Sequence, residues 1–114
     1  MSQELTPSLK LMVEQQMPWT VLHVSGELGW ESHNTFDDCL SELVNSAYQP
    51  RICIDLSQLE FCDSSGVASM VRAWRTATRK GRTLILLRPA ENLARKLVSM
   101  GLDGMLPVVD ELPG

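Results

Sequence analysis

The sequence is poor in cysteine and in positive charge, and each shortage excludes a class of protein. Only 3 cysteines occur in 114 residues, and none forms a C-x-x-C pair. We therefore expect neither a disulfide scaffold nor a zinc site. We expect the protein to reside in a reducing cytoplasmic compartment. Ten Lys and Arg against 14 Asp and Glu give a net charge of −4. That balance disfavours direct binding to nucleic acid or to an anionic membrane.

Long hydrophobic runs and nucleotide-binding motifs are also missing. No stretch approaches the roughly 18 apolar residues of a membrane span, and residues 1–7 lack the basic and apolar regions of a signal peptide. The sequence contains no P-loop, no G-x-G-x-x-G and no G-x-S-x-G. His23 and His33 lack the spacing of metal ligands or of a catalytic triad, so we expect them in structural roles. We predict no catalytic residue, no metal and no cofactor, hence no enzyme.

The apolar content, 44%, is that of a globular domain. We expect one domain over residues 8–110, with short tails at 1–7 and 111–114. Alternating or continuous apolar residues predict strands at 9–14, 19–24, 52–56, 83–87 and 105–109. The short connection at Met17-Pro18 favours an antiparallel hairpin between the first two strands, and Gly26 and Gly29 break the pattern of the second.

Three segments show the one-sided hydrophobic stripe of a surface helix. In residues 33–47 the stripe comprises Phe36, Cys39, Leu40, Leu43, Val44 and Ala47. Between residues 64 and 80 it comprises Val67, Met70, Val71, Trp74 and Thr78. In residues 90–100 it comprises Leu93, Leu97 and Met100.

The ends of these helices carry their own signals. Ser32 or Asn34 can cap the first helix, and Asp37 and Asp38 suit its positive first turn. Glycines at positions 81 and 101 are placed to end the second and third helices. Alternating strands and helices then imply right-handed crossovers. The fold class is α/β: a mixed, mostly parallel sheet with an N-terminal antiparallel hairpin and three main helices.

One tetrapeptide, Asp63-Ser64-Ser65-Gly66, combines a helix start with two hydroxyls. It follows a central strand, and the carboxyl ends of such strands are where open α/β sheets build their sites. Asp63 is a good N-cap for the N–H groups of Ser65 or Gly66. Many such tetrapeptides are only helix starts, and that alternative stays open on these four residues alone.

Helical geometry places Ser65 opposite the apolar stripe of its helix, at about 100° per residue. Ser69, Arg72 and Thr76 follow on the same side, so we expect Ser65 to be exposed on an outer face. Gly66 lacks a side chain, which suggests that another protein can approach closely there.

The surroundings of the tetrapeptide resemble the STAS domain, and within it the bacterial anti-sigma factor antagonists. Three segments carry the resemblance: Gly26-Glu27-Leu28, the run from Ile54 to Gly66, and the run from Met100 to Val108. The likeness extends from about residue 9 to residue 110, in the order of the predicted elements. It implies a single STAS-like domain.

The resemblance also implies a function. In that family an anti-sigma factor with serine kinase activity phosphorylates the second hydroxyl of the motif, here Ser65. The unmodified antagonist binds the anti-sigma factor and frees a sigma factor, and a PP2C-type phosphatase reverses the modification. The residues expected at the partner surface are Glu27, Gly29, Trp30, Asp63, Ser64, Ser65, Gly66, Ser69 and Arg72.

Two features near the motif stay open. The family commonly has Gly-Glu-Leu-Asp where this chain has Gly26-Glu27-Leu28-Gly29, which puts partner choice or phosphorylation efficiency in question. Trp30 follows directly, either as a partner contact or as loop packing. Cys62 belongs either to the core or to a reactive site beside the motif.

Two other functions fit a single STAS domain. Similar domains are accessory subunits of lipid-trafficking ABC transporters, but these commonly carry Thr-Ala where this chain has Ser64-Ser65. A scaffold subunit of a stress-signalling assembly is the third alternative.

Overall fold

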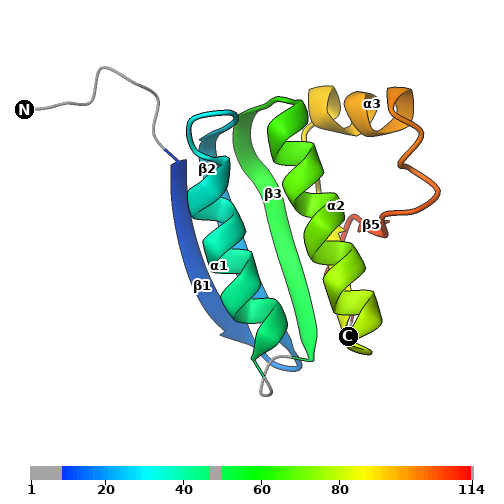
Figure 1. Cartoon of the computed structure of the whole chain (residues 1–114). Helices are drawn as coiled ribbons and strands as arrows, with labels where there is room; N and C mark the ends of the chain where they lie inside the picture. The colour runs from blue at the N-terminus through cyan, green and yellow to red at the C-terminus, as the bar shows by residue number, and fades with distance from the viewer. Residues whose placement is uncertain (1–8, 47–49, 114) are drawn as a thin grey trace, which may run out of the picture.

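The computed structural model describes residues 9–46 and 50–113, which form one sheet and three helices (Figure 1). The strands are β1 (Leu9–Gln16), β2 (Trp19–Leu28), β3 (Arg51–Cys62), β4 (Thr83–Leu87) and β5 (Val108–Val109). The helices are α1 (His33–Asn45), α2 (Ser64–Arg79) and α3 (Glu91–Ser99). The strand order is β1-β2-β3-β4-β5, with β1 antiparallel to β2 and all other neighbours parallel. This is the predicted fold class.

The side chains of the strands alternate between two faces of the sheet. One face packs against α1 and α2, which lie side by side in front of the sheet in Figure 1. Its main cluster joins alternate residues of β2, β3 and β4 to all three helices. The largest fully buried side chains are Phe36, Leu22, Leu28, Leu40, Ile52, Ile54, Leu56, Met70, Leu84, Leu86, Leu97 and Leu106.

The outer face of the sheet carries a smaller apolar cluster. Its buried members are Trp19, Val21, Cys53, Ile85 and Leu87. Leu112 packs against this cluster, and the indole Nε1 of Trp19 donates to the carbonyl oxygen of Pro113 at 2.9 Å. Residues 111–113, for which the sequence suggests only a tail, therefore lie against the sheet.

Two helices end as their glycines predict. Gly81 and Gly101 have φ values of 72° and 73°. In each case the next N–H reaches back to the helix: Arg82 N to Ala77 O at 2.8 Å, and Leu102 N to Leu97 O at 2.9 Å. This is the Schellman arrangement, so the predicted stops are confirmed.

Several predicted boundaries are wrong, because sheet pairing tolerates irregular backbone. β2 does not break at Gly26 but continues to Leu28, with register shifts against β3 on either side of that glycine. For the same reason β3 extends to Cys62 rather than ending at residue 56. β5 is shorter than predicted, because only Val108 and Val109 pair with β4.

The helix predictions need four corrections. α1 ends at residue 45, and the predicted stripe member Ala47 lies outside the described residues. The first turn of α1 holds no acidic residue, because Asp37 and Asp38 lie one turn later. Thr78 and Met100, predicted to face inward, are exposed where each helix ends. Within the described part of the chain, none of the helices is long and apolar enough to cross a membrane.

Candidate functional site

The carboxylate of Asp63 organises the start of α2. Its Oδ1 accepts the main-chain N–H groups of Ser65 at 2.9 Å and Gly66 at 3.2 Å, as the N-cap prediction requires. Its Oδ2 accepts the N–H of Trp30 at 3.1 Å, a contact that the sequence does not reveal. One side chain thus fixes both the helix start and the loop between β2 and α1. An N-cap of this kind stabilises a helix by about 1 kcal/mol.

Gly29 makes that double contact possible. A Cβ at position 29 would lie 2.8 Å from the Oδ2 of Asp63, which is too close for an undisturbed contact. The loop is further closed by Ser32, whose hydroxyl accepts the Gly29 N–H and donates to the Glu27 carbonyl, each at 3.0 Å. Ser32 precedes α1 but makes no side-chain cap to it. In this chain, the close approach of the Asp63 carboxylate explains why glycine stands at position 29, where the family commonly has aspartate.

The two serines of the motif differ in exposure. Ser64 is exposed, whereas Ser65 is half-buried and so less open than predicted. The main-chain groups of Ser65 are both used, its N–H by Asp63 and its carbonyl by the hydroxyl of Ser69 at 3.2 Å. Within residues 9–46 and 50–113, no hydrogen bond uses the side-chain hydroxyl of either Ser64 or Ser65. Both hydroxyls are free to react.

Gly66 has an internal packing role. It is buried, and a Cβ there would lie 2.7 Å from the Sγ of Cys62 and 2.7 Å from the Cγ of Leu28. The expectation that this glycine opens the surface to another protein is wrong. The missing side chain instead lets the start of α2 sit close to the ends of β2 and β3.

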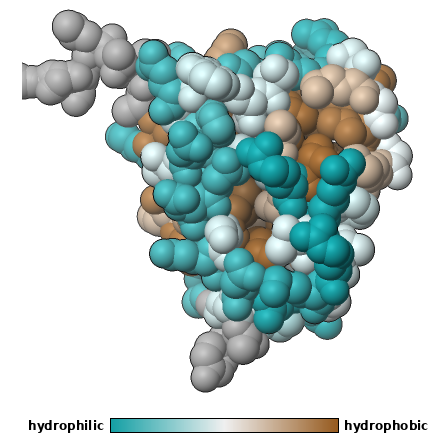
Figure 2. Space-filling view, viewed as in Figure 1, coloured by the Kyte–Doolittle hydropathy of each residue, from teal (hydrophilic) through white to brown (hydrophobic). Residues whose placement is uncertain are grey.

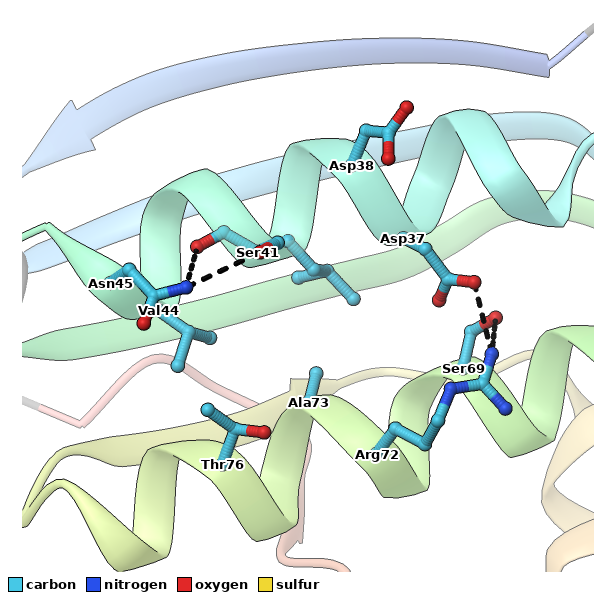
Figure 3. Close-up of a pocket in the computed structure, with 10 residues that line it drawn as sticks. Asp37, Asp38, Ser41, Val44, Asn45, Ser69, Arg72, Ala73 and Thr76 are labelled. Atoms are coloured by element: carbon cyan, nitrogen blue, oxygen red, sulfur yellow. Dashed lines mark hydrogen bonds and ion pairs between the residues drawn. The ribbon is translucent and has the colours of Figure 1, made fainter.

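Ser69 is not on an open outer face, because α1 covers that side of α2, whereas the Arg72 side chain is exposed as predicted. Ser69 is 1% exposed. The Nη2 of Arg72 donates to the Ser69 hydroxyl at 3.2 Å and to the Oδ2 of Asp37 on α1 at 2.9 Å (Figure 3). These contacts border a groove of about 330 Å³ between the two helices. Polar side chains cover both helices around it, with apolar surface visible between them (Figure 2).

A separate hollow of about 240 Å³ brings together four of the nine predicted surface residues, but its lining includes neither serine of the motif. Its lining comprises Glu27, Gly29, Trp30, Glu31, Ser32, Phe61 and Asp63. Trp30 is 75% exposed and Phe61 47% exposed. Such solvent-facing aromatic rings are characteristic of protein interfaces. The sequence prediction missed Phe61, although a large apolar residue two positions before the cap was a usable signal.

Cys62 belongs to the core. It is buried, and burial, assisted by the charge of Asp63, raises the pKa of its thiol to about 12. Such a thiol is almost wholly protonated near neutrality and is a poor nucleophile. The core alternative is the one that the structure supports.

Both histidines contact carboxylates. On the outer face of the sheet, His23 lies between two carboxylates, with Nε2 at 2.7 Å from Glu14 and Nδ1 at 2.7 Å from Asp55. Burial lowers the pKa of His23, but its hydrogen bonds and charge contacts with these carboxylates outweigh burial and raise it. His33 lies 3.4 Å from Asp37. Among the described residues, no group of three or more His, Cys, Asp or Glu side chains is arranged to hold a metal ion.

A family model described as "Mlab, STAS domain" matches residues 11–109. It covers most of the chain, including both sides of the Asp63–Gly66 motif. The chain therefore belongs to the STAS domain family, as the resemblance of its motifs suggested.

Solved structures, among them anti-sigma factor antagonists, share the fold. One from Mycobacterium paratuberculosis is 24% identical with a TM-score of 0.84, over 92% of this chain and 88% of the other. The phosphorylated form of Bacillus SpoIIAA is 21% identical with a TM-score of 0.70, over 90% and 93%. An RsbS variant from Moorella thermoacetica is 20% identical with a TM-score of 0.72, over 90% and 88%. At these identities the likeness establishes the fold.

Proposed function

We propose that this STAS domain is an anti-sigma factor antagonist controlled by phosphorylation at Ser65. In the unmodified state it binds an anti-sigma factor that is also a serine kinase, and so releases a sigma factor. A PP2C-type phosphatase restores the unmodified state. The chain itself is a substrate and a binding module rather than an enzyme.

The observation that carries this proposal is the way Asp63 presents the Ser65 hydroxyl. The main chain of Ser65 is held at both its N–H and its carbonyl, while its hydroxyl makes no hydrogen bond within the described part of the chain. A fixed backbone with a free hydroxyl suits a phosphoryl acceptor, because the nucleophile is positioned without being occupied.

The hollow beside Asp63 is the proposed partner surface. Glu27, Gly29, Trp30 and Asp63 border it, and Ser64 and Ser65 follow at the start of α2. Exposed Trp30 offers a large apolar contact, which favours a partner contact over loop packing for this ring. Gly66 packs against Cys62 and Leu28, the Ser69 hydroxyl donates to the Ser65 carbonyl, and Arg72 joins α2 to α1 through Asp37.

Phosphorylation would act through local charge. A phosphoserine adds about −1.5 to −2 charges at neutral pH. The contact at Ser65 is matched to a small neutral hydroxyl, so a partner that docks there would have to accommodate and desolvate the bulky dianion. Desolvating such a group costs about 3 kcal/mol, which corresponds to about a hundredfold loss of affinity.

Site mapping tests the acceptor directly. The chain is incubated with a candidate serine-kinase anti-sigma factor and ATP, and the product is mapped by mass spectrometry for wild type, Ser65→Ala and the exposed control Ser41→Ala. We expect modification of wild type and Ser41→Ala, and loss of most of it in Ser65→Ala. Equal modification of all three chains would remove Ser65 from the mechanism.

The family description gives a specific reason to retain a second candidate, since it names Mlab and not an anti-sigma factor antagonist. In that alternative the chain is an accessory subunit of a lipid-trafficking ABC transporter and binds its ATPase without a phosphorylation cycle. Ser64-Ser65 in place of Thr-Ala favours the switch. Co-purification with an ATPase that is unaffected by Ser65→Ala and Ser65→Glu would favour the transporter, and a scaffold role would require assembly into a large complex.

A further inference from the structure

A second groove lies between the first residue of α2 and α3. It has a volume of about 570 Å³ and is lined by Ser64, Asn92, Arg95, Lys96, Ser99 and Met100. In Figure 1, α3 lies on one side of the start of α2 and the β2–α1 loop lies on the other. The described lining residues include two cations and no carboxylate, although the whole chain has a net charge of −4. The groove is thus locally basic.

Both cations are available to a new anion. Within residues 9–46 and 50–113, Lys96 makes no ion pair, and it lines the groove together with Ser64 of the motif. Arg95 pairs only with Glu91, at 3.3 Å, and the two side chains are 73% and 82% exposed. An exposed pair of this kind is worth about 0–1 kcal/mol, so the guanidinium is easily redirected.

The two motif serines face different charges. Ser64 lines the basic groove, whereas Ser65 does not. The helix turn above Ser65 presents Ser69 and Arg72, and the guanidinium of Arg72 is already held by Asp37 at 2.9 Å. A phosphate on Ser64 would therefore meet two cations, while one on Ser65 would lie on the side of α2 that carries Arg72, which is already paired with Asp37.

We propose that the α2–α3 groove is a phosphate site and that Ser64 is a second phosphoryl acceptor. The proposal rests on the proposed function for the kinase that supplies the phosphoryl group. The Oγ of Ser64 attacks the γ-phosphorus of ATP on that kinase and forms an O–P bond. The bond from that phosphorus to the β,γ-bridging oxygen breaks, ADP leaves, and the hydroxyl proton passes to a base of the kinase. Arg95 and Lys96 then hold the phosphate.

Modification at the two serines should therefore affect different properties of the domain, its stability in one case and its binding in the other. A phosphate at Ser64 lies at the positive end of α2, which favours an anion, and ties α2 to α3 through Arg95 and Lys96. A phosphate at Ser65 instead excludes, by its bulk and its desolvation cost, a partner surface matched to the neutral hydroxyl. The first modification stabilises the domain, and the second switches off binding.

Chemically defined phosphoproteins test the groove without any kinase. Phosphoserine is incorporated at position 64 during translation, and the second ionisation of the phosphate is followed by ³¹P NMR as the pH is varied. The controls are phosphoserine at exposed position 41, near Asp37 and Asp38, and the Arg95→Gln/Lys96→Gln double variant. We expect the midpoint at position 64 to be lower than at position 41 by about half a pH unit or more. The double variant should remove most of that difference, and a midpoint unchanged by it would overturn the phosphate site.

Mapping on Ser65→Ala tests whether Ser64 is an acceptor. With a kinase that modifies wild type at Ser65, we expect phosphate at Ser64 in wild type and in Ser65→Ala. Modification confined to Ser65 would overturn this half of the proposal. Modification of neither serine by any candidate kinase would instead count against the proposed function, and the NMR titration would still decide the groove.

Discussion

The two faces of the sheet are stabilised by different interactions. Toward α1 and α2, buried aliphatic side chains such as Leu22 and Ile54 form one continuous cluster. The outer face carries two features: the smaller apolar cluster under residues 111–113 and the ion pairs of His23 with Glu14 and Asp55. The helix-covered face therefore dominates stability and holds the motif in place, while the outer face adds a contribution that depends on pH.

The largest expected effect separates the two faces with one residue type. Met70 of α2 is 0% exposed, and Met12 of β1 is 60% exposed on the outer face. We expect Met70→Ala to lower the free energy of unfolding by about 2–5 kcal/mol, because it leaves a cavity. Met12→Ala should change it by less than about 0.5 kcal/mol. Urea unfolding measures both, and similar losses would contradict the contrast.

The next effect concerns the seating of α2 on the sheet. Gly66→Ala introduces a Cβ that would lie 2.7 Å from both Cys62 and Leu28, so the helix start must shift. We expect a loss of about 1–3 kcal/mol, typical of overpacking. Gly104→Ala is the matched control, since a Cβ there meets nothing within 4 Å. Chemical denaturation of the two variants gives the comparison, and a neutral Gly66→Ala would show that this close approach is not required.

A smaller effect is expected at Gly29. Restoring the family's carboxylate with Gly29→Asp brings a side chain to within 2.8 Å of the Oδ2 of Asp63 and disturbs its contact with Trp30. We expect a loss of about 1 kcal/mol, with Gly29→Asn less affected because it adds no charge. The difference between the two variants should shrink in high salt. An Asp variant as stable as wild type at low salt would argue against the packing explanation for Gly29.

The smallest effect is the pH dependence from the outer face. Because the folded pKa of His23 is raised above 6.5, its contribution is present below that value and is lost as the pH rises through the folded pKa. Burial opposes ionisation of Asp55, but hydrogen bonds from Ser57 and the contact with His23 lower its pKa below 3.8. Its contribution is therefore lost as the pH falls.

Stability should therefore be greatest between these two limits. Urea unfolding from a pH within this range to one above the folded pKa of His23 should show the alkaline decline in wild type and in His33→Gln, and a flatter profile in His23→Gln. Parallel profiles for all three proteins would mean that the imidazole between Glu14 and Asp55 contributes nothing to pH dependence.

Local signals in the sequence predicted where helices begin and end better than which of their faces are exposed. The cap at Asp63 and the stops at Gly81 and Gly101 depend on a few adjacent residues, and all three are found as predicted. The angular position of Ser69 on α2 was also readable, but a helical projection does not reveal which neighbour covers a face. Here α1 covers it, which is why Ser69 is buried.

Contacts between residues far apart in the sequence could not be predicted from local patterns. His23 and Asp55 are 32 positions apart and meet only because β2 and β3 pair in parallel register. The bond from Trp30 N to the carboxylate of Asp63 spans 33 positions. In the same way, Phe61 and Trp30 are brought to one hollow by the ends of β2 and β3. Neither periodicity nor capping rules carry this information.

The most direct test of the central idea is a binding titration by calorimetry. Chain with an unmodified Ser65 and chain with phosphoserine incorporated at 65 are titrated against the same serine-kinase anti-sigma factor. The proposed switch predicts that the phosphorylated chain binds about a hundredfold more weakly or not at all, with an unchanged far-UV circular dichroism spectrum. Equal affinities for the two chains would contradict it.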